Sequence, residues 1–441
     1  MHGILPTNGL EWLFTLTLLP PLAFFAGCVA LNLRFVVSAL RTEASDKGGR
    51  EARRSHGEEN PCPGYRFLIL IPAHNEELLL ADTLRSLTAL NYPSAAYEVL
   101  VIADNCTDRT ASIAREHGVC VYERQDLTRV GKGYALNDAI QALLSLSPPS
   151  ADPLSGNPLC LCVPSIATGE NPDALVFLDA DTLVEPNLLQ VFAEGLRRGE
   201  SVQQTRYEVR NPNASWRTRL LACALALIHI AKPLGRERLH LSDSLKGNGM
   251  CLTPEILIGT PWRGDALAED LDYTLRLVRQ GVRVAFRPDA VVYGEMAANA
   301  RSAATQRRRW EAGRWQLLRQ TPALLLEGIR TRNRLLIDRA LDLLIPPFAE
   351  RFALLLALAA LACFIAQRAP GLSMALLAGG FFTIIGLEVA TLAMALRIAR
   401  VPRRAVLSLL FAPVYLIWKL TLLIGLALRR TPLRWQRTER T

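Results

Sequence analysis

Two aspartates separated by one small residue have the spacing of a divalent-cation site. Asp179 and Asp181 flank Ala180 directly after the apolar run ALVFL. Carboxylates at this spacing can hold Mg²⁺ or Mn²⁺, with the oxygens of a bound diphosphate completing the coordination shell. Aspartate is also common in the turns that follow strands, so the triplet alone is equally consistent with a turn that holds no ligand.

Asp104 and Lys132 are the residues in the first half of the chain best suited to contact a nucleotide. Asp104 ends the run EVLVIA, and a carboxylate at a strand end can accept hydrogen bonds from a base or a ribose. Asp108 follows in NCTD, where we expect it to cap the next helix. Lys132 lies between Gly131 and Gly133, which allow close approach to a phosphate, although a solvated loop lysine is the simpler alternative.

A second acidic site begins an amphipathic segment later in the chain. Glu269 and Asp270 stand together in GDALAEDLDYTLRLVRQG. Acidic residues at a helix start ordinarily complement the helix dipole. The catalytic alternative is that Asp270 takes the proton from an attacking hydroxyl group.

The string QRRRW at 306–310 is the most distinctive local pattern. Arg309 can bind the charge that develops on a diphosphate, and Trp310 can form an apolar wall beneath a sugar. The alternative is a basic amphipathic helix on an anionic membrane, a role that suits Arg307 and Arg308.

The elements that must position these residues alternate from Phe67 onward. Short apolar runs such as FLILIP, YEVLVIAD and ALVFLDAD predict buried strands, with segments of helical spacing between them. This alternation predicts right-handed crossovers and a mostly parallel sheet, so the class is α/β. Ligands bind at the carboxyl ends of such strands, where Pro72, Ala73, Asp104 and the Asp179–Asp181 triplet lie.

Apolar segments at both ends of the chain predict membrane helices. Residues 10–40 are long enough to span a bilayer. Arg34 is the first Lys or Arg, so the positive-inside rule places the N-terminus outside and residue 41 onward in the cytosol. In the tail, we expect 346–367 and 371–396 to form a hairpin.

A third apolar stretch, 404–428, contains Pro413 and Lys419. We expect it to lie in the membrane interface or to re-enter, because a third full span would place the Arg-rich C-terminus outside. A hairpin of two spans followed by an interfacial segment keeps the basic flanks of all three segments in the cytosol.

The composition of three further stretches predicts a linker, a surface insertion and an amphipathic helix. Residues 41–64 are polar and Gly-rich and predict a flexible linker. Residues 145–172, rich in Pro, Ser and Gly, predict a surface insertion, and 331–350 predict an amphipathic helix on the membrane surface. The expected division of the chain is 1–40, 41–64, 65–320, 321–350, 351–428 and 429–441.

The charge distribution argues against a nucleic-acid partner, and the cysteine spacing argues against a zinc site. The net charge is +9, and much of the excess arginine flanks the apolar segments, which favours membrane topology over nucleic acid as its cause. No nucleic-acid-binding signature interrupts the middle domain. Cys160 and Cys162 form a lone C-x-C without a matching pair, which disfavours a zinc site.

The ordered set IPAHNE, Asp104, DAD, ED and QRRRW resembles the membrane-integrated glycosyltransferases of family 2. Relatives include cellulose, chitin, hyaluronan and poly-N-acetylglucosamine synthases and ceramide glucosyltransferase. The resemblance covers about residues 66–320 and the plan of flanking membrane segments. It implies a GT-A fold with a Rossmann-like sheet, a UDP-sugar donor, a Mg or Mn ion, and direct displacement with inversion at the anomeric carbon.

The resemblance also implies roles for individual residues. Asp270 is the expected general base, Asp181 is expected on the metal, and Asp179 is expected at the ribose or metal side. The donor-binding residues that it implies are Pro72, Ala73, Glu76, Asp104, Lys132 and Asp179. The residues that it implies around the diphosphate and acceptor are Glu269, Gln306, Arg309, Trp310, Gly247 and Asn248.

Three departures from the family pattern stand out, and the last one bears on the product. Ala268 stands where the base motif often has Thr, and LKGNGM at 245–250 differs from the acceptor-contacting loop of the cellulose type. The C-terminal membrane region is short for a polymer channel. It therefore favours addition of one sugar to a lipid-linked or glycan acceptor over processive synthesis.

The resulting expectation is an integral membrane enzyme with its catalytic domain on the cytosolic side of a bacterial inner membrane. Membrane lipids are expected partners, and polysaccharide export proteins are further candidates. Three alternatives are a processive polysaccharide synthase, a nucleotidyltransferase that releases pyrophosphate, and a catalytically inactive membrane scaffold. A degenerate scaffold should lose acidic residues first, and this chain retains them at 104, 179, 181, 269 and 270.

Overall fold

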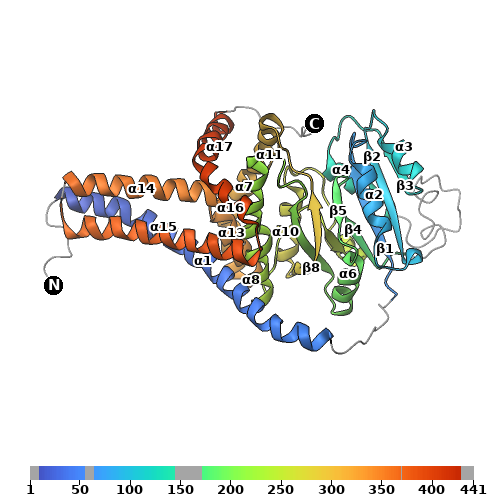
Figure 1. The fold of residues 1–441 in the computed structure, drawn as a ribbon, viewed down its shortest axis with the longest axis horizontal. Helices are drawn as coiled ribbons and strands as arrows, with labels where there is room; N and C mark the ends of the chain where they lie inside the picture. Colours follow the sequence, from blue (N-terminus) through green and yellow to red (C-terminus); the bar gives the residue numbers. More distant parts are fainter. Residues whose placement is uncertain (1–8, 55–63, 145–170, 369, 429–441) are drawn as a thin grey trace.

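A computed structural model describes residues 9–54, 64–144, 171–368 and 370–428. Most of the predicted insertion at 145–172 and the whole basic tail at 429–441 lie outside the described residues. Figure 1 shows two parts: a sheet covered by helices, and a bundle of long helices that extends away from it.

One sheet of eight strands forms the centre of the first part, in the order β3-β2-β1-β4-β7-β6-β8-β5. β1 (Phe67–Ala73) pairs in parallel with β2 (Tyr97–Asp104) and β4 (Ala174–Phe177), and β2 pairs in parallel with β3 (Cys120–Arg124). The other strands are β5 (Thr182–Val184), β6 (Val202–Val209), β7 (Met250–Leu252) and β8 (Ala285–Gly294). β6 and β8 are parallel, whereas β7 runs antiparallel to β4 and β6, and β5 runs antiparallel to β8. The prediction of a mostly parallel α/β sheet is confirmed.

Strand β1 is a continuous apolar run because it is buried on both faces of the sheet. Ile69 and Ile71 belong to the core on one face of the sheet, and Leu68 and Leu70 to the core on the other. Both faces are covered by helices, so no position alternates with a solvent-facing polar residue. The helices over the first face are α2 (Leu80–Thr88), α3 (Thr110–Glu116) and α6 (Leu188–Arg197). Those over the second are α4 (Lys132–Leu144), α9 (Pro254–Gly259) and α10 (Glu269–Arg279).

A continuous helical segment connects the sheet with the bundle. It consists of α7 (Trp216–Leu225), a π-helical turn η2 (Ala226–Ala231) and α8 (Lys232–Arg238). After β8 come α11 (Ala300–Leu318), α12 (Thr321–Arg330) and α13 (Arg334–Leu344).

The apolar face of α13 is covered by protein. Leu336, Ala340 and Leu343 pack in one cluster with Leu275 of α10 and Leu324 of α12. The amphipathic pattern at 331–350 was expected to place this face on the membrane surface. That expectation is wrong for α13, because the same periodicity serves packing against neighbouring helices.

Three long helices form the bundle: α1 (Gly9–Arg54), α14 (Phe348–Arg368) and α15 (Leu372–Ile398). α14 and α15 pack against each other as the expected hairpin, and α1 packs along α15. Figure 1 shows that α1 begins at the end far from the sheet, where α14 leads into α15. α1 continues as helix to Arg54, so the predicted flexible linker is helical over 41–54. Its Ala, Glu, Lys and Arg residues favour continued helix.

The chain ends with α16 (Arg403–Leu407), a 3-10 turn η3 (Ser408–Phe411) and α17 (Ala412–Ala427). In Figure 1, α17 and the α7–α8 segment run across the direction of the bundle. Within the described residues, five helices are long and apolar enough to cross a membrane. They cover Trp12–Arg41, Trp216–Arg238, Phe348–Arg368, Leu372–Ile398 and Arg403–Gly425.

Candidate active site

A cavity of about 540 Å³ lies at the carboxyl ends of the parallel strands, between the sheet and helices α7, α10 and α11. It brings together residues that are distant in the sequence, from Pro72 in β1 to Trp310 in α11 and Asp342 in α13. The predicted residues that line it are Pro72, Ala73, Glu76, Asp104, Lys132, Asp179, Asp181, Gly247, Glu269, Asp270, Gln306, Arg309 and Trp310.

Asn248 is the predicted contact residue that does not line this cavity. Its side chain is fully buried behind the Asp179–Asp181 turn. Its Oδ1 accepts a hydrogen bond from the Asp179 backbone N–H at 3.1 Å, and its Nδ2 donates to Thr182 Oγ1 at 2.8 Å. The expectation of an acceptor contact is therefore wrong, and Asn248 instead holds the turn that carries both aspartates.

The two aspartates of the triplet lie in the turn between β4 and β5. Asp181 is almost fully buried, and Asp179 is about one-third exposed. Within the described residues, no three His, Cys, Asp or Glu side chains form a metal cage. A pair of carboxylates at a cavity wall supplies only oxygen ligands, which is the donor set that Mg²⁺ or Mn²⁺ uses together with phosphate oxygens. The residues therefore fit a cation that is held jointly with a diphosphate.

Lys132, at the start of α4, lies among these acidic groups. Its Nζ forms an ion pair with Asp179 and donates to the Gly247 carbonyl at 2.5 Å. Burial alone would lower the pKa of Lys132, but the carboxylates of Asp179, Glu269 and Asp270 outweigh it and raise this pKa. Gly247 has a φ of +73°, a conformation that glycine adopts without strain and that its loop requires here.

Asp104 is held at the cavity wall by a buried arginine. Arg124 Nη1 lies 2.6 Å from Asp104 Oδ1, and the same guanidinium contacts Asp126 at 3.1 Å and Asp138 at 2.7 Å. Burial raises the pKa of Asp104, and Arg124 opposes this rise. Asp108 accepts from the Thr110 backbone N–H at 2.9 Å, but Arg109 is the N-cap residue of α3 and, among the described residues, no side chain caps this helix, so the expected capping role of Asp108 is wrong.

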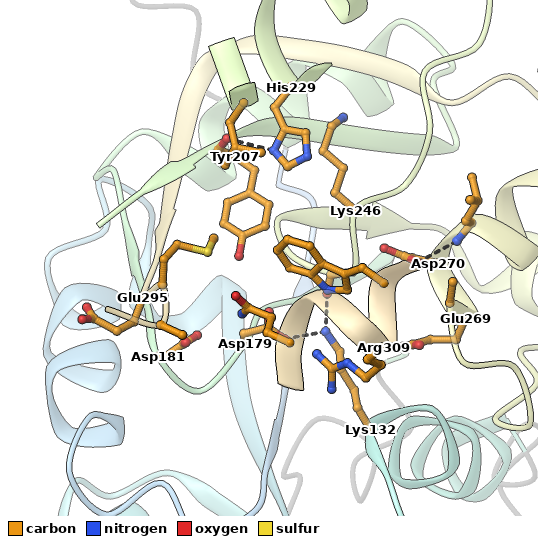
Figure 2. Close-up of a pocket in the computed structure, with 18 of the residues that line it drawn as sticks. Lys132, Asp179, Asp181, Tyr207, His229, Lys246, Glu269, Asp270, Glu295 and Arg309 are labelled. Carbon is orange, nitrogen blue, oxygen red and sulfur yellow. Dashed lines mark hydrogen bonds and ion pairs between the residues drawn. The ribbon is translucent and has the colours of Figure 1, made fainter. Parts of the chain in front are cut away.

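Glu269 and Asp270 form the first turn of α10, and Figure 2 shows both carboxylates directed toward the middle of the cavity. Burial raises the pKa of both groups. The charge of Asp270 raises the pKa of Glu269 further, whereas Lys132 lowers both. The Leu271 backbone N–H donates to Asp270 Oδ1 at 2.8 Å, which leaves the second oxygen of this carboxylate directed inward.

Helix α11 closes the cavity from the opposite side. Gln306, Arg309 and Trp310 line it, and so does Arg307, whose guanidinium lies 5.1 Å from the centre of the Trp310 ring. Trp310 also packs against a small apolar cluster that contains Leu225 and Met296. Arg309 lies close enough to Glu269 to lower the pKa of that carboxyl group.

Part of the cavity wall is apolar. Leu221, Ala224, Leu225 and Ile228 line it from the α7–η2 segment, which belongs to one of the five helices apolar enough for a membrane. Ile228 is 47% exposed. The same cavity therefore joins acidic groups at the strand ends to a wall of aliphatic side chains.

Arg124 and Glu295 are two of the residues at this site that sequence reasoning missed. Arg124 ends β3, and nothing local distinguishes it from the many surface arginines of the chain. Glu295 lines the cavity directly after β8 and accepts from Asn211 Nδ2 at 2.5 Å. Its position just beyond a strand is a signal that could have identified it.

Comparison with known proteins gives consistent results. A sequence profile described as "Glycosyltransferase like family 2" matches residues 63–313. The probable glycosyltransferase YdaM of Bacillus subtilis is 26% identical over 249 residues, which cover 56% of this chain and 54% of that protein. The beta-monoglucosyldiacylglycerol synthase of Trichormus variabilis is 27% identical over 275 residues, which cover 60% of this chain and 52% of that protein. The chain thus spans about half the length of these curated relatives.

Among solved structures, one similar chain is the mannosyltransferase PcManGT from Pyrobaculum calidifontis in complex with GDP-Man and Mn²⁺. It is 19% identical with a TM-score of 0.46, and the similarity covers 84% of this chain and 97% of that one. The family assignment depends on the sequence profile, whose match covers more than half of the 441 residues. With its GT-A-type sheet and flanking apolar helices, this chain belongs to glycosyltransferase family 2.

Proposed function

We propose that this glycosyltransferase moves one sugar from a nucleotide diphosphate sugar, a UDP-sugar in our expectation, to a lipid acceptor taken from the membrane. The observation that carries the proposal is the composition of the cavity. One cavity is lined both by acidic groups at the strand ends, which suit a nucleotide-sugar donor, and by aliphatic side chains of the α7–η2 segment.

In the proposed mechanism, the donor lies over the carboxyl ends of β1, β2 and β4. Asp104 and Glu76 would accept hydrogen bonds from the nucleoside, and Asp179 and Asp181 would hold a divalent cation against the diphosphate. That cation would supply positive charge to the leaving diphosphate. Lys132 and Arg309 would add donors of their own to the same phosphates.

Asp270 would act as the general base. Its inward carboxylate oxygen would accept the proton of the acceptor hydroxyl as that oxygen attacks the anomeric carbon. The bond to the diphosphate would break on the opposite side of the sugar, which gives inversion without a covalent enzyme intermediate. Glu269 and Trp310 would border the acceptor, and the stacking surface of Trp310 suits a sugar or a lipid headgroup.

The aliphatic wall supports a lipid acceptor over a free soluble sugar. Leu221, Leu225 and Ile228 have no polar atoms for a hydroxyl-rich ligand, but they match an acyl or prenyl chain. The relatives named for the synthesis of beta-monoglucosyldiacylglycerol provide a precedent for a glycolipid product in this family.

The proposed membrane is the bacterial inner membrane, with the sheet on its cytosolic side. Arg397, Arg400 and Arg403 support this orientation, because they lie at the sheet-proximal end of α15 and the start of α16. A cysteine introduced at the α14–α15 turn should react in intact cells with a thiol reagent that does not cross the membrane, because this orientation places the turn outside the cytosol.

A product assay tests the proposal. The purified full chain is incubated with a panel of nucleotide sugars, Mn²⁺ and extracted membrane lipids, and the products are analysed by mass spectrometry. We expect a nucleoside diphosphate and a lipid whose mass rises by one hexose or one N-acetylhexosamine. A ladder of sugar masses would instead support a processive synthase, and pyrophosphate would support a nucleotidyltransferase. No transfer with any donor and lipid would overturn the proposal.

A further inference from the structure

A buried charge lies directly beside the cavity-lining residues of α11. Glu311 follows Trp310 in the sequence, but it does not line the cavity, and only 5% of its surface is exposed. Its Oε1 lies 3.0 Å from Nζ of Lys419, a residue of α17 that is 3% exposed. The residue that follows the predicted QRRRW string is thus tied to the last described helix of the chain.

Lys419 also contacts a second carboxylate. Its Nζ lies 2.5 Å from Oε1 of Glu350, in the first turn of α14. One lysine therefore joins α17 to α11 through Glu311 and to α14 through Glu350. Such buried pairs add little net stability, but loss of one partner leaves an uncompensated buried charge.

Helix α17 has few other attachments to the protein. Val414, Ile417, Leu420 and Ile424 are between 50% and 68% exposed, whereas Leu422 is buried. The neighbours of α17 include α11 and α14, the two helices that supply the carboxylates for Lys419. The exposed aliphatic face and the orientation of α17 across the bundle suit a helix that lies in a lipid bilayer (Figure 1).

We propose that Glu311 and Lys419 are positioning residues for the reaction. In this inference, which rests on the proposed function, the ion pair transmits the position of the membrane-embedded α17 to α11. The ion pair thereby sets the position of Arg309 and Trp310 relative to the acceptor. Neither residue touches the substrates, so the pair acts through α11 alone.

Three single variants separate this role from general stabilisation. Glu311→Gln removes the link from α17 to α11 and leaves Lys419 paired with Glu350. Glu350→Gln is the matched control, because it makes the same chemical change at the same lysine but leaves the link to α11 intact. Lys419→Arg keeps the positive charge and should retain the wild-type behaviour.

Kinetics are measured on full-length protein in vesicles of phosphatidylethanolamine and phosphatidylglycerol, with the donor and acceptor found in the product assay. For Glu311→Gln we expect kcat/KM for the acceptor to fall about 10- to 100-fold, because a displacement near 1 Å has an effect of this size. The KM for the donor should stay within about twofold. Glu350→Gln and Lys419→Arg should stay within about threefold of wild type in all parameters.

Hydrogen exchange supplies a readout that does not need turnover. Backbone amides of α11 should exchange faster in Glu311→Gln than in Glu350→Gln, since only the first variant releases this helix from α17. Equal exchange and equal kinetics in these two variants would overturn the coupling and leave a purely structural ion pair. If the wild-type chain transfers no sugar, the proposed function fails, but the exchange comparison still decides whether Glu311 couples the two helices.

Discussion

At the scale of single residues, Lys132 connects the two acidic sites of the cavity. Its ammonium group contacts Asp179 on the donor side and lowers the pKa of Glu269 and Asp270 on the other side. A base that must be ionised before it can accept a proton benefits from this charge. In the proposed mechanism, Lys132 would therefore favour ionisation of the base as well as bind phosphate, which was its only expected role.

The first prediction concerns the general base. Asp270→Asn keeps the size of the side chain but cannot accept the acceptor proton, so kcat should fall by at least about 100-fold. Binding of the nucleotide sugar, measured by calorimetry, should stay within about threefold of wild type. Asp265→Asn is the control, since Asp265 is exposed in the loop before α10 and does not line the cavity. Wild-type turnover in Asp270→Asn would exclude Asp270 as the base.

The second prediction concerns pH. Burial raises the pKa of Asp270 above its ordinary value, so kcat should increase with pH as this group loses its proton. Lys132→Met removes a charge that lowers the pKa of Asp270, and it should move the rising limb of the profile to higher pH. Lys132→Arg retains the charge and should keep the limb near its wild-type position. A limb that does not move in Lys132→Met would mean that another group controls the profile.

At the scale of elements, α10 and α11 approach each other closely just before Asp270, the proposed base. A Cβ atom placed on Gly313 would lie 2.7 Å from the Cβ of Ala268, the residue just before Glu269. Ala268 stands where the family motif often has Thr. The contact gives a physical reason for small residues at both positions, because larger ones would separate the two helices.

The third prediction follows from this contact. Gly313→Ala should push α11 away from the start of α10 and lower kcat about 10- to 100-fold, since the catalytic groups on the two helices would no longer align. Gly386→Ala in α15 is the control, because a Cβ there meets no atom within 4 Å. Steady-state kinetics of the two variants make the test. Unchanged kcat in Gly313→Ala would show that the helices tolerate the separation.

Local patterns predicted the parallel half of the sheet and the residues at its strand ends. FLILIP and ALVFLDAD reveal β1 and β4 because strands buried on both faces are continuous apolar runs. The pairing of β7 with β4 and β6 depends on contacts between distant segments, and no local pattern encodes them. Asn248 was assigned the wrong role for the same reason, since its partner Asp179 is distant in sequence. Arg124 was missed because its role depends on burial between three carboxylates, which the sequence around it does not show.

The amphipathic pattern of α13 shows a different limit of prediction. A helix with one apolar face can place it on a membrane or on other helices, and the periodicity is the same in both cases. The partners of the charged face show which of the two surfaces the helix packs on. Asp338 and Asp342 of α13 meet Arg236 of α8 at 3.1 and 2.9 Å, so this face is also engaged within the protein.

At the scale of the whole molecule, two sets of ion pairs join helices α11 and α13, which follow the sheet, to the apolar helices. Lys419 connects α11 with α17, and the acidic face of α13 holds α8 through Lys232 and Arg236. α8 continues the segment that supplies the aliphatic part of the cavity wall. The position of the proposed acceptor site relative to the membrane therefore depends on both sets of pairs.

The fourth prediction tests the link between α8 and α13. Burial alone would raise the pKa of Asp342, but Arg236, Lys232 and Arg339 outweigh it and hold this pKa well below its ordinary value. A carboxyl group with a lowered pKa in the folded state stabilises the fold above its unfolded pKa of about 3.8. This contribution is lost as the pH falls below that value. The melting temperature in detergent should therefore fall as the pH decreases below about 4.

Asp342→Asn should lower the free energy of unfolding at pH 7 by about 3–5 kcal/mol, because the buried Lys232 loses its carboxylate partner and the buried Arg236 loses one of its two. The acid-induced fall in melting temperature should become shallower, since one of the carboxylates that cause it is absent. Glu327→Gln is the control, because its pair with Arg279 is partly exposed and contributes about 0–1 kcal/mol. Equal melting temperatures for the two variants at pH 7 would show that the α8–α13 ion pairs stabilise the fold no more than an exposed pair does.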